Sequence, residues 1–280
     1  MTELTVLLDN LTFPEGPRWR DGRLWFSDFY AHEVVAVDMK GARETIVTVP
    51  NQPSGLGWTP DGALLIVSMI NRSLLRLENG DLSTVADLSS LAGYHCNDMV
   101  VDSQGRAYVG NFGYNTYAGE EARGANLIRV DPDGAIHHAE SDLRFPNGSV
   151  ITPDDKTLII GETHANRLTA WDKATDGTLS NRRVWADLGD GYPDGICLDA
   201  EGAIWVADPR NKETIRVTEG GAVTDRISTG EHGSYACMLG GEDRKTLFIC
   251  TCAASGPDMA AQRTGRIEYT KVAVPGAGRP

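Results

Sequence analysis

The chain has 280 residues, of which 41% are hydrophobic, and it contains 31 glycines and 13 prolines. This composition is typical of a turn-rich globular protein, while the formal net charge of -13 disfavours binding to nucleic acids or to anionic membrane surfaces. The sequence has no apolar run of about 18 residues and no basic N-terminal region followed by an apolar core, so we expect a cytoplasmic protein without membrane contact.

Short apolar stretches recur from the N-terminus onward and predict β-strands. The first are residues 24–28, 34–38 and 45–49, and later pairs are 74–77 with 85–88 and 168–171 with 184–188. Hairpin-type dipeptides lie between such stretches: Asp21-Gly22, Asp61-Gly62, Asn79-Gly80, Gln104-Gly105, Asp133-Gly134, Asp176-Gly177 and Glu201-Gly202. The spacing predicts four strands in each repeating unit.

A longer repeat organises these strands. Six segments each begin with a short motif centred on Gly, or on Asp98 or Ala236 in its place, and each continues into a second apolar stretch. They are Phe13–Asp28, Pro53–Ser68, His95–Gly110, Phe145–Gly161, Tyr192–Asp208 and Ser234–Cys250. A period of about 40 to 50 residues built from short strands is typical of β-propeller blades. We therefore predict an all-β, six-bladed β-propeller with four-stranded blades, forming a single domain over residues 1–280.

The N-terminal segment predicts how the ring closes. Residues 5–11 stand just before the first repeat motif, as residues 184–188 stand just before the fifth. The N-terminal strand is therefore expected to be the outer strand of the last blade, which runs from about residue 233 to 274. Such a closure removes open sheet edges.

One position of the repeat carries polar residues in all six copies. The residue before the central Gly, or before its replacement, is expected to point into the central channel from each innermost strand. These residues are Glu15, Ser54, Asn97, Asn147, Asp194 and Tyr235. Four of the six are carboxylate or amide oxygen donors, which hard cations prefer.

Glu15, Asn147 and Asp194 form the strongest candidate site, because two carboxylates and an amide converging on one axis could bind a divalent cation with oxygen ligands. The alternative is that these residues only shape turns, since Asn-Gly and Asp-Gly are common turn dipeptides. Turn chemistry alone would not require the blades to differ so systematically at one position.

Further candidates accompany this set. Asn97 could reach substrate or an activated water, and His95, two residues earlier on the same strand face, could contact substrate at the channel mouth or simply be exposed. His164 and Glu162 could form a second layer behind the site, although packing explains them as well. The segment from Phe112 to Ala125 interrupts the third blade and is equally compatible with a binding-site lid and with a plain surface loop.

The cysteines and the absence of several enzyme motifs disfavour some kinds of active site. The cysteines, Cys96, Cys197, Cys237, Cys250 and Cys252, are odd in number and form no C-x-x-C pair, so we expect small buried hydrophobic residues. The sequence contains no G-x-S-x-G elbow, Walker A loop or H-E-x-x-H motif, which disfavours serine-hydrolase, nucleotide-binding and zincin functions.

Four ordered motifs resemble the SMP-30/gluconolactonase/luciferin-regenerating-enzyme family. They are FPEGPRW at 13–19, NDMVVD at 97–102, FPNG at 145–148 and YPDGICLD at 192–199, and the likeness continues at 240–251 and 264–267. The resemblance implies a six-bladed propeller that hydrolyses lactones of sugars or other small molecules. It also implies one catalytic divalent cation held by Glu15, Asn147 and Asp194, with Asn97 contacting substrate or the metal-bound water. Sugar-lactonase members often carry Arg where this chain has His95.

The leading hypothesis is a metal-dependent lactonase whose substrate is a small molecule, with no nucleic-acid or membrane partner and with the oligomeric state left open. Asp194 is expected to act as both ligand and general base. Ca²⁺ is the first choice because all expected ligands are oxygens, with Zn²⁺, Mg²⁺ and Mn²⁺ as alternatives. The other hypotheses are a hydrolase of an aryl ester, phosphotriester or epoxide, and a non-catalytic propeller with a structural ion.

Overall fold

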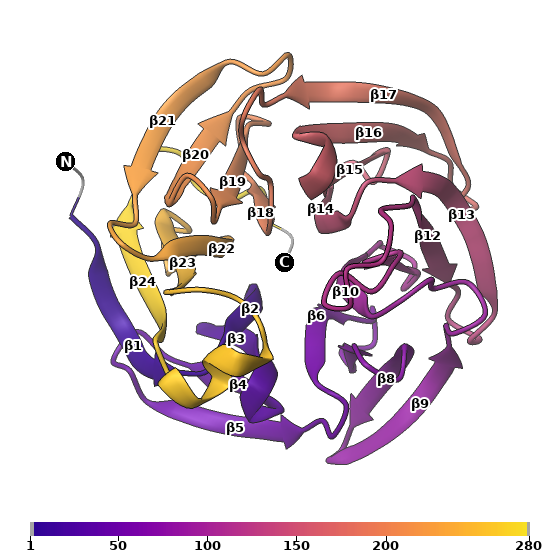
Figure 1. Ribbon diagram of the computed structural model, residues 1–280, viewed down its shortest axis with the longest axis horizontal. Helices are drawn as coiled ribbons and strands as arrows, with labels where there is room; N and C mark the ends of the chain where they lie inside the picture. The colour runs from indigo at the N-terminus through magenta and orange to yellow at the C-terminus, as the bar shows by residue number, and fades with distance from the viewer. Residues whose placement is uncertain (1–2, 279–280) are drawn as a thin grey trace.

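The computed structural model describes residues 3–278 and arranges them in six four-stranded antiparallel sheets around a central axis (Figure 1). We number the sheets as blades in chain order. Blade 1 holds β2 (Pro14–Arg20), β3 (Arg23–Asp28), β4 (Glu33–Val37) and β5 (Arg43–Thr48). Blade 2 holds β6 (Pro53–Trp58), β7 (Leu64–Ser68), β8 (Ser73–Glu78) and β9 (Asp81–Asp87). Blade 3 holds β10 (Cys96–Val101), β11 (Ala107–Asn111), β12 (Ala125–Val130) and β13 (Ile136–Leu143).

The second half of the ring repeats this plan. Blade 4 holds β14 (Pro146–Ile151), β15 (Thr157–Glu162), β16 (Arg167–Lys173) and β17 (Leu179–Asp187). Blade 5 holds β18 (Ile196–Leu198), β19 (Ile204–Asp208), β20 (Glu213–Val217) and β21 (Val223–Ser228). Blade 6 holds β22 (Gly233–Gly240), β23 (Thr246–Cys252), β24 (Gly265–Lys271) and β1 (Thr5–Leu11). Three short 3-10 helices lie in the connections: η1 (Phe29–Ala31), η2 (Thr163–Ala165) and η3 (Pro257–Gln262).

The ring is closed by the N-terminal strand, as the sequence predicted. β1 pairs antiparallel with β24, from Thr5 opposite Tyr269 to Leu11 opposite Gly265. Figure 1 shows the indigo β1 lying along the yellow β24 at the outside of blade 6. The six-bladed, four-stranded propeller is therefore confirmed, and the first and last parts of the chain share one sheet.

The core lies between neighbouring blades, where the middle strands are covered on both faces. All residues of β7 and β23 are buried, whereas the outermost β5 and β21 are mostly exposed. Apolar residues therefore follow one another without alternation in the middle strands, as expected for a strand that is buried on both sides. The largest side chains enclosed in this way include Trp171, Trp205 and Phe248.

Close packing near the axis explains the Gly of the repeat motif. A side chain at Gly148 would collide with the backbone of Ile196 in blade 5, and one at Gly195 would collide with Ala236 in blade 6. Gly148 lies within strand β14, so Asn147-Gly148 is part of a strand and not a turn. The glycines are required because the innermost strands of adjacent blades converge, and this convergence brings the preceding residues to the axis.

Among residues 3–278, none of the helices has the length and apolar character needed to span a membrane.

Candidate active site

A cavity of about 670 Å³ opens at one end of the central channel and is lined by residues from all six blades. This volume is typical of small-molecule sites. Its floor holds five of the six predicted channel residues: Glu15, Asn97, Asn147, Asp194 and Tyr235. The sixth, Ser54, is buried next to blade 1, where its carbonyl accepts a hydrogen bond from the Ser27 hydroxyl at 2.7 Å. In blade 2, Gln52 lines the cavity instead.

Backbone hydrogen bonds between blades hold the channel residues in place. The Gly148 N–H donates to the carbonyl of Asp194 at 3.1 Å, and the Gly195 N–H donates to the carbonyl of Tyr235 at 2.8 Å. Within blade 5, the Asp194 N–H donates to the carbonyl of Ala207 at 2.9 Å. These bonds couple blades 4, 5 and 6 at the level of the site, so its side chains are carried by rigid strands.

The two axial carboxyl groups, Glu15 and Asp194, influence each other's pKa. Burial, followed by the charge of Asp194, raises the pKa of Glu15 well above its ordinary value. Burial also raises the pKa of Asp194, with a smaller opposing effect from a hydrogen bond with Asn147 and a further rise from the charge of Asp98. Two neighbouring carboxyl groups that are removed from bulk water are costly to ionise unless a cation binds between them.

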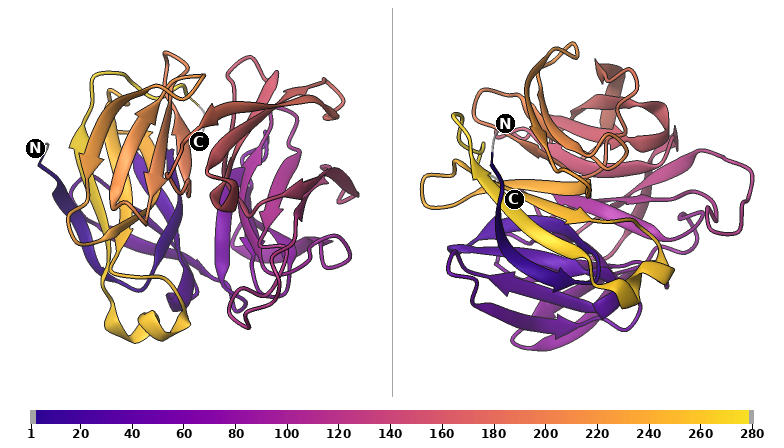
Figure 2. Two further views of the ribbon diagram at one scale, coloured as in Figure 1. Left: turned by 45° about the horizontal axis from the view of Figure 1, so that its top comes forward. Right: turned by 60° about the vertical axis from the view of Figure 1, so that its left-hand side comes forward.

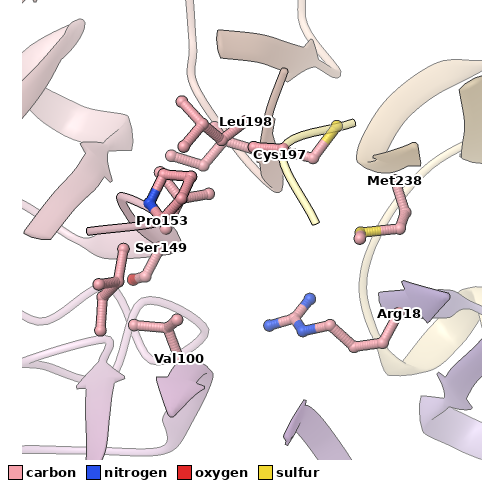
Figure 3. Close-up of a pocket in the computed structure, with 11 residues that line it drawn as sticks. Arg18, Val100, Ser149, Pro153, Cys197, Leu198 and Met238 are labelled. Carbon is pink, nitrogen blue, oxygen red and sulfur yellow. The ribbon is translucent and has the colours of Figure 1, made fainter. Parts of the chain in front are cut away.

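Arg18, a positively charged side chain of the channel, already has its own partners. The Arg18 guanidinium donates to the Asp98 carboxylate at 2.8 Å and to the Met99 carbonyl at 2.6 Å. Arg18 also lines a cavity of about 20 Å³ at the opposite end of the channel. The wall of this small cavity includes Ser149 and Ile196, which follow the axial residues Asn147 and Asp194 along the chain. Figure 3 shows the guanidinium pointing into the space between Val100, Ser149, Cys197 and Met238.

The donor set at the floor of the larger cavity fits a hard cation. Within residues 3–278, no three His, Cys, Asp or Glu side chains gather in an arrangement suited to a metal ion, so the available donors are the two carboxylates together with amides. The Asn147 amide is oriented by Nδ2 donating to the Thr163 hydroxyl at 3.3 Å, and that hydroxyl donates to the Pro193 carbonyl at 2.7 Å. Oxygen donors of this kind suit Ca²⁺ or Mg²⁺.

Asn97 and His95 both reach the cavity, as predicted from their spacing. Asn97 is buried in β10, and His95 lies just before that strand and stacks on Tyr94 with ring centroids 4.0 Å apart and an interplanar angle of 14°. Burial, with a smaller effect from the charge of Arg72, lowers the pKa of His95 below its ordinary value. His95 therefore faces the cavity as a neutral imidazole at neutral pH.

His164 and Glu162 separate in the structure because η2 begins between them. His164 lines the cavity, with its Nδ1 3.1 Å from the Tyr114 hydroxyl. Glu162 is completely buried outside the cavity wall, where it accepts hydrogen bonds from the Arg144 N–H at 2.8 Å, from Arg167 at 2.9 Å and from the Thr169 hydroxyl. Glu162 thus ties down the segment that leads into Asn147.

Two other blades have a buried acidic residue in the same position as Glu162, which sequence reasoning did not predict. Asp28 accepts from the Phe13 N–H at 2.7 Å, and Asp208 accepts from the Tyr192 N–H at 2.9 Å. Each acceptor stands at the end of the second strand of its blade and holds the segment before an axial residue. The signal was present, because an acidic residue ends the second apolar stretch in three of the repeats.

The cavity wall above the axial residues was missed as well, except for His95. In five blades the residue two positions before the axial one lines the cavity: Phe13, Gln52, His95, Phe145 and Tyr192. Period-two alternation places these residues on the same side as the axial ones. They form an upper ring, and we use that name below for these five residues.

The segment between β11 and β12 extends across the cavity mouth. Thr116 and Tyr117 line the cavity, and the Tyr117 hydroxyl forms a hydrogen bond with that of Tyr30. Tyr30 in turn accepts a hydrogen bond from the Gly256 N–H at 3.0 Å, next to η3. The left view of Figure 2 shows η3, in yellow, projecting from one end of the ring. The segment is therefore part of the cavity rim.

The lining that the structure describes for this cavity includes none of the five cysteines. All five are free and buried, in agreement with the expectation that they serve as small hydrophobic residues. The sulfurs of Cys197 and Cys237 are 3.8 Å apart between blades 5 and 6.

This six-bladed propeller, with carboxylate and amide donors at the floor of its axial cavity, belongs to the class of lactonase-like hydrolases, as its family and its named relatives show. The chain is a member of the SMP-30/Gluconolactonase/LRE-like family, whose model matches residues 13–253.

Two relatives named as lactonases match nearly the full chain. A pentonolactonase of Haloferax volcanii is 25% identical over 269 residues, covering 94% of this chain and 89% of the relative. A 6-deoxy-6-sulfogluconolactonase of Pseudomonas putida is also 25% identical, covering 95% and 93%. Among solved structures, the calcium-binding protein regucalcin from Agrobacterium tumefaciens shares the fold with a TM-score of 0.84 and 23% identity, covering 100% of this chain and 97% of that one.

Proposed function

We propose that this protein is a metal-dependent lactone hydrolase in which Glu15, Asn147 and Asp194 hold one divalent cation at the floor of the cavity. The observation that carries the proposal is the pair of buried carboxyl groups whose pKa values are both raised, next to an amide oriented by Thr163. A divalent cation would compensate the charge that burial makes unfavourable. The nearest guanidinium, Arg18, already pairs with Asp98.

When bound, the cation would polarise the lactone carbonyl and make water more acidic. The chain's own residues perform the remaining steps. Asp194, the axial carboxylate that is partly exposed to the cavity, takes a proton from the attacking water as general base. The hydroxyl group adds to the acyl carbon, the ring C–O bond breaks, and Asp194 returns the proton to the leaving alkoxide. The product is a hydroxy acid.

Asn97 and Glu15 have supporting roles in this mechanism. Asn97 is 7% exposed and lies on β10, so its amide is held rigidly and can orient the water or the carbonyl oxygen. Glu15 is 9% exposed and accepts a hydrogen bond from the Gly16 N–H at 2.9 Å. It is therefore suited to hold the cation and not to exchange protons with solvent.

Ca²⁺ is the preferred ion of the proposal, because carboxylate and amide oxygens are its usual ligands. A related solved structure is named as a calcium-binding protein, which supports the same choice. Zn²⁺, Mg²⁺ and Mn²⁺ remain alternatives, since geometry and availability influence which ion a site of this kind takes.

A lactone panel tests the proposal. The protein is freed of metal with a chelator and assayed by acid release with a range of lactones, before and after addition of each ion. We expect ion-dependent hydrolysis that is lost in Asp194→Asn and retained in Asp190→Asn, a matched change at an exposed position of the same connection. Hydrolysis that survives full chelation would refute the metal role. Ligand binding without turnover of any lactone, aryl ester, phosphotriester or epoxide would instead support a small-molecule-binding propeller.

A further inference from the structure

The wall of the axial cavity is rich in aromatic side chains. Four phenylalanines and six tyrosines line it. The lining described by the structure contains no Lys or Arg, and its charged groups are the two carboxylates at the floor. Burial lowers the pKa of both cavity imidazoles, His95 and His164, so these residues also add no positive charge at neutral pH.

The aromatic residues of blades 3 and 4 form one continuous wall. Phe112 and Phe145 are stacked with ring centroids 4.5 Å apart and an interplanar angle of 22°. His95 lies 6.0 Å from Phe112 on one side, and His164 lies 4.7 Å from Phe145 on the other. Phe145 lines the cavity from the upper ring, and Phe112 lines it from the segment after β11.

A second aromatic group faces it from blades 1 and 6, which lie across the axis from blades 4 and 3 (Figure 1). Phe13 is its centre: the ring of Tyr235 meets it edge-on with centroids 4.7 Å apart, and Phe29 and Tyr30 lie 5.5 and 5.8 Å away. The carboxylates of Glu15 and Asp194 lie at the floor between the two walls.

From this arrangement we infer that the substrate is an uncharged lactone bearing a flat apolar group, such as an aryl ring, which is held between the Phe112–Phe145 wall and Phe13. This inference rests on the proposed function for the lactone and adds the class of substituent. Aromatic walls bind flat apolar groups by burial and offset stacking.

The same wall disfavours the alternatives. A hydroxyl of a sugar lactone placed against the ring of Phe112, Phe145 or Phe13 would lose water without gaining a hydrogen-bond partner from that ring, which is unfavourable. A sulfonate or phosphate group would meet no Lys or Arg in the described lining. The relatives named as pentonolactonase and sulfogluconolactonase are 25% identical to this chain, so their substrates need not transfer.

A binding measurement separates this inference from the proposed hydrolysis. The Ca²⁺-loaded protein is titrated with 3,4-dihydro-2-quinolinone, an aryl lactam that resists hydrolysis, and with gluconolactam as its hydroxylated counterpart. In parallel, kcat/KM is measured for dihydrocoumarin, D-glucono-δ-lactone and 6-phosphoglucono-δ-lactone.

Phe145→Leu and Phe112→Leu test the wall, because leucine keeps an apolar side chain and removes the ring. The matched control is Trp58→Leu, a partly buried aromatic residue of blade 2 that packs against Trp25 away from the cavity. We expect the quinolinone to bind more tightly than gluconolactam. Both wall variants should weaken quinolinone binding and raise KM for dihydrocoumarin by roughly 3- to 10-fold. They should raise KM for glucono-δ-lactone less than KM for dihydrocoumarin, and the control should behave as wild type.

The outcomes are distinct. Quinolinone binding that depends on Phe145, without hydrolysis of any lactone, would support the substituent class and refute the proposed function. Hydrolysis of glucono-δ-lactone in preference to dihydrocoumarin, or wall variants that affect both lactams equally, would overturn the inference while leaving the lactonase intact. Melting curves show whether each variant is folded.

Discussion

Arg18 donates to Asp98 at 2.8 Å in the channel, and this buried pair leaves Glu15 and Asp194 as two carboxylates that the guanidinium does not neutralise. Asp98, in blade 3, stands where most repeats have Gly. Its negative charge pairs with Arg18 and holds the guanidinium in place. The arrangement keeps negative charge at the floor of the cavity, where a divalent cation and a substrate carbonyl are proposed to meet.

The first prediction concerns metal binding. Glu15→Gln, Asn147→Ala and Asp194→Asn should each weaken the uptake of Ca²⁺, because each removes one oxygen donor or its charge. At 100 times the dissociation constant, an ion that binds only the folded protein stabilises it by about 2.7 kcal/mol. The wild type should then melt roughly 5 °C higher with Ca²⁺ than with chelator. Titration calorimetry of the chelated protein checks this, and absence of divalent-ion uptake by the wild type would rule out the central site.

The second prediction is a pH dependence of the metal-free protein. Because folding raises the pKa of Glu15 and Asp194 above the ordinary values of 4.5 and 3.8, the folded state binds more protons than the unfolded state. The contribution of these groups to stability is therefore present at low pH and is lost as the pH rises through the raised values.

Glu15→Gln removes one of these carboxyl groups. In chelator, the variant should lose less stability than the wild type between pH 5 and pH 8, and it should gain less from Ca²⁺ at pH 8. Urea unfolding at several pH values measures the effect, with Glu219→Gln at an exposed position as the matched control. Identical pH profiles for wild type and Glu15→Gln would contradict the electrostatic account of the site.

The third prediction concerns ring closure. Deleting residues 1–9 removes most of β1 and leaves β24 without its outer partner. We expect aggregation, or a loss of stability on the order of 3–5 kcal/mol, because several backbone hydrogen bonds and the packing of Leu7 and Leu8 disappear. Size-exclusion chromatography and thermal melting detect either result. A deletion of residues 1–3 serves as control, and a soluble 1–9 deletion with unchanged melting would be incompatible with this closure.

The fourth prediction concerns specificity at His95. Arginine offers five donors in a fixed fork, whereas a neutral imidazole offers one, so His95→Arg should favour hydroxyl-rich lactones. We expect the ratio of kcat/KM for an aldonolactone to that for an aryl lactone to rise by about tenfold, the effect of roughly one hydrogen bond to a charged group. His137→Arg, at an exposed position in β13, is the control. A ratio unchanged from wild type would mean that His95 does not contact substrate.

The fifth prediction concerns Glu162, whose carboxylate accepts from the Arg144 N–H, Arg167 and Thr169. Glu162→Ala should destabilise the fold by about 2–4 kcal/mol, since it leaves buried donors without a partner. Because Glu162 lies outside the cavity, kcat at a temperature where the variant is folded should stay near the wild-type value. Urea unfolding and steady-state assays measure the two effects, and a large fall in kcat with unchanged stability would show a direct role in the reaction.

The sequence alone determined the fold and the axial residues. A repeat of about 40 to 50 residues is recorded directly in the chain, because each blade is a local unit of hydrogen-bonded neighbours. The N-terminal strand was also placed correctly, since its pattern matched the strand that precedes another repeat. Alignment of the repeat motifs then predicted that Glu15, Asn97, Asn147 and Asp194 would share the channel, and the structure brings them together at the cavity floor.

Only the tertiary structure decided which other residues share that cavity. Ser54 follows the same motif as Glu15 but is buried and does not line the cavity, where Gln52 stands for blade 2, because packing between blades and not spacing alone decides which residues reach the cavity. His164 and Glu162 were separated by a single turn of 3-10 helix, and the stacking of Phe112 on Phe145 joins residues of two blades. The sequence records what is periodic within a blade, whereas contacts between blades depend on how closely the sheets approach around the axis.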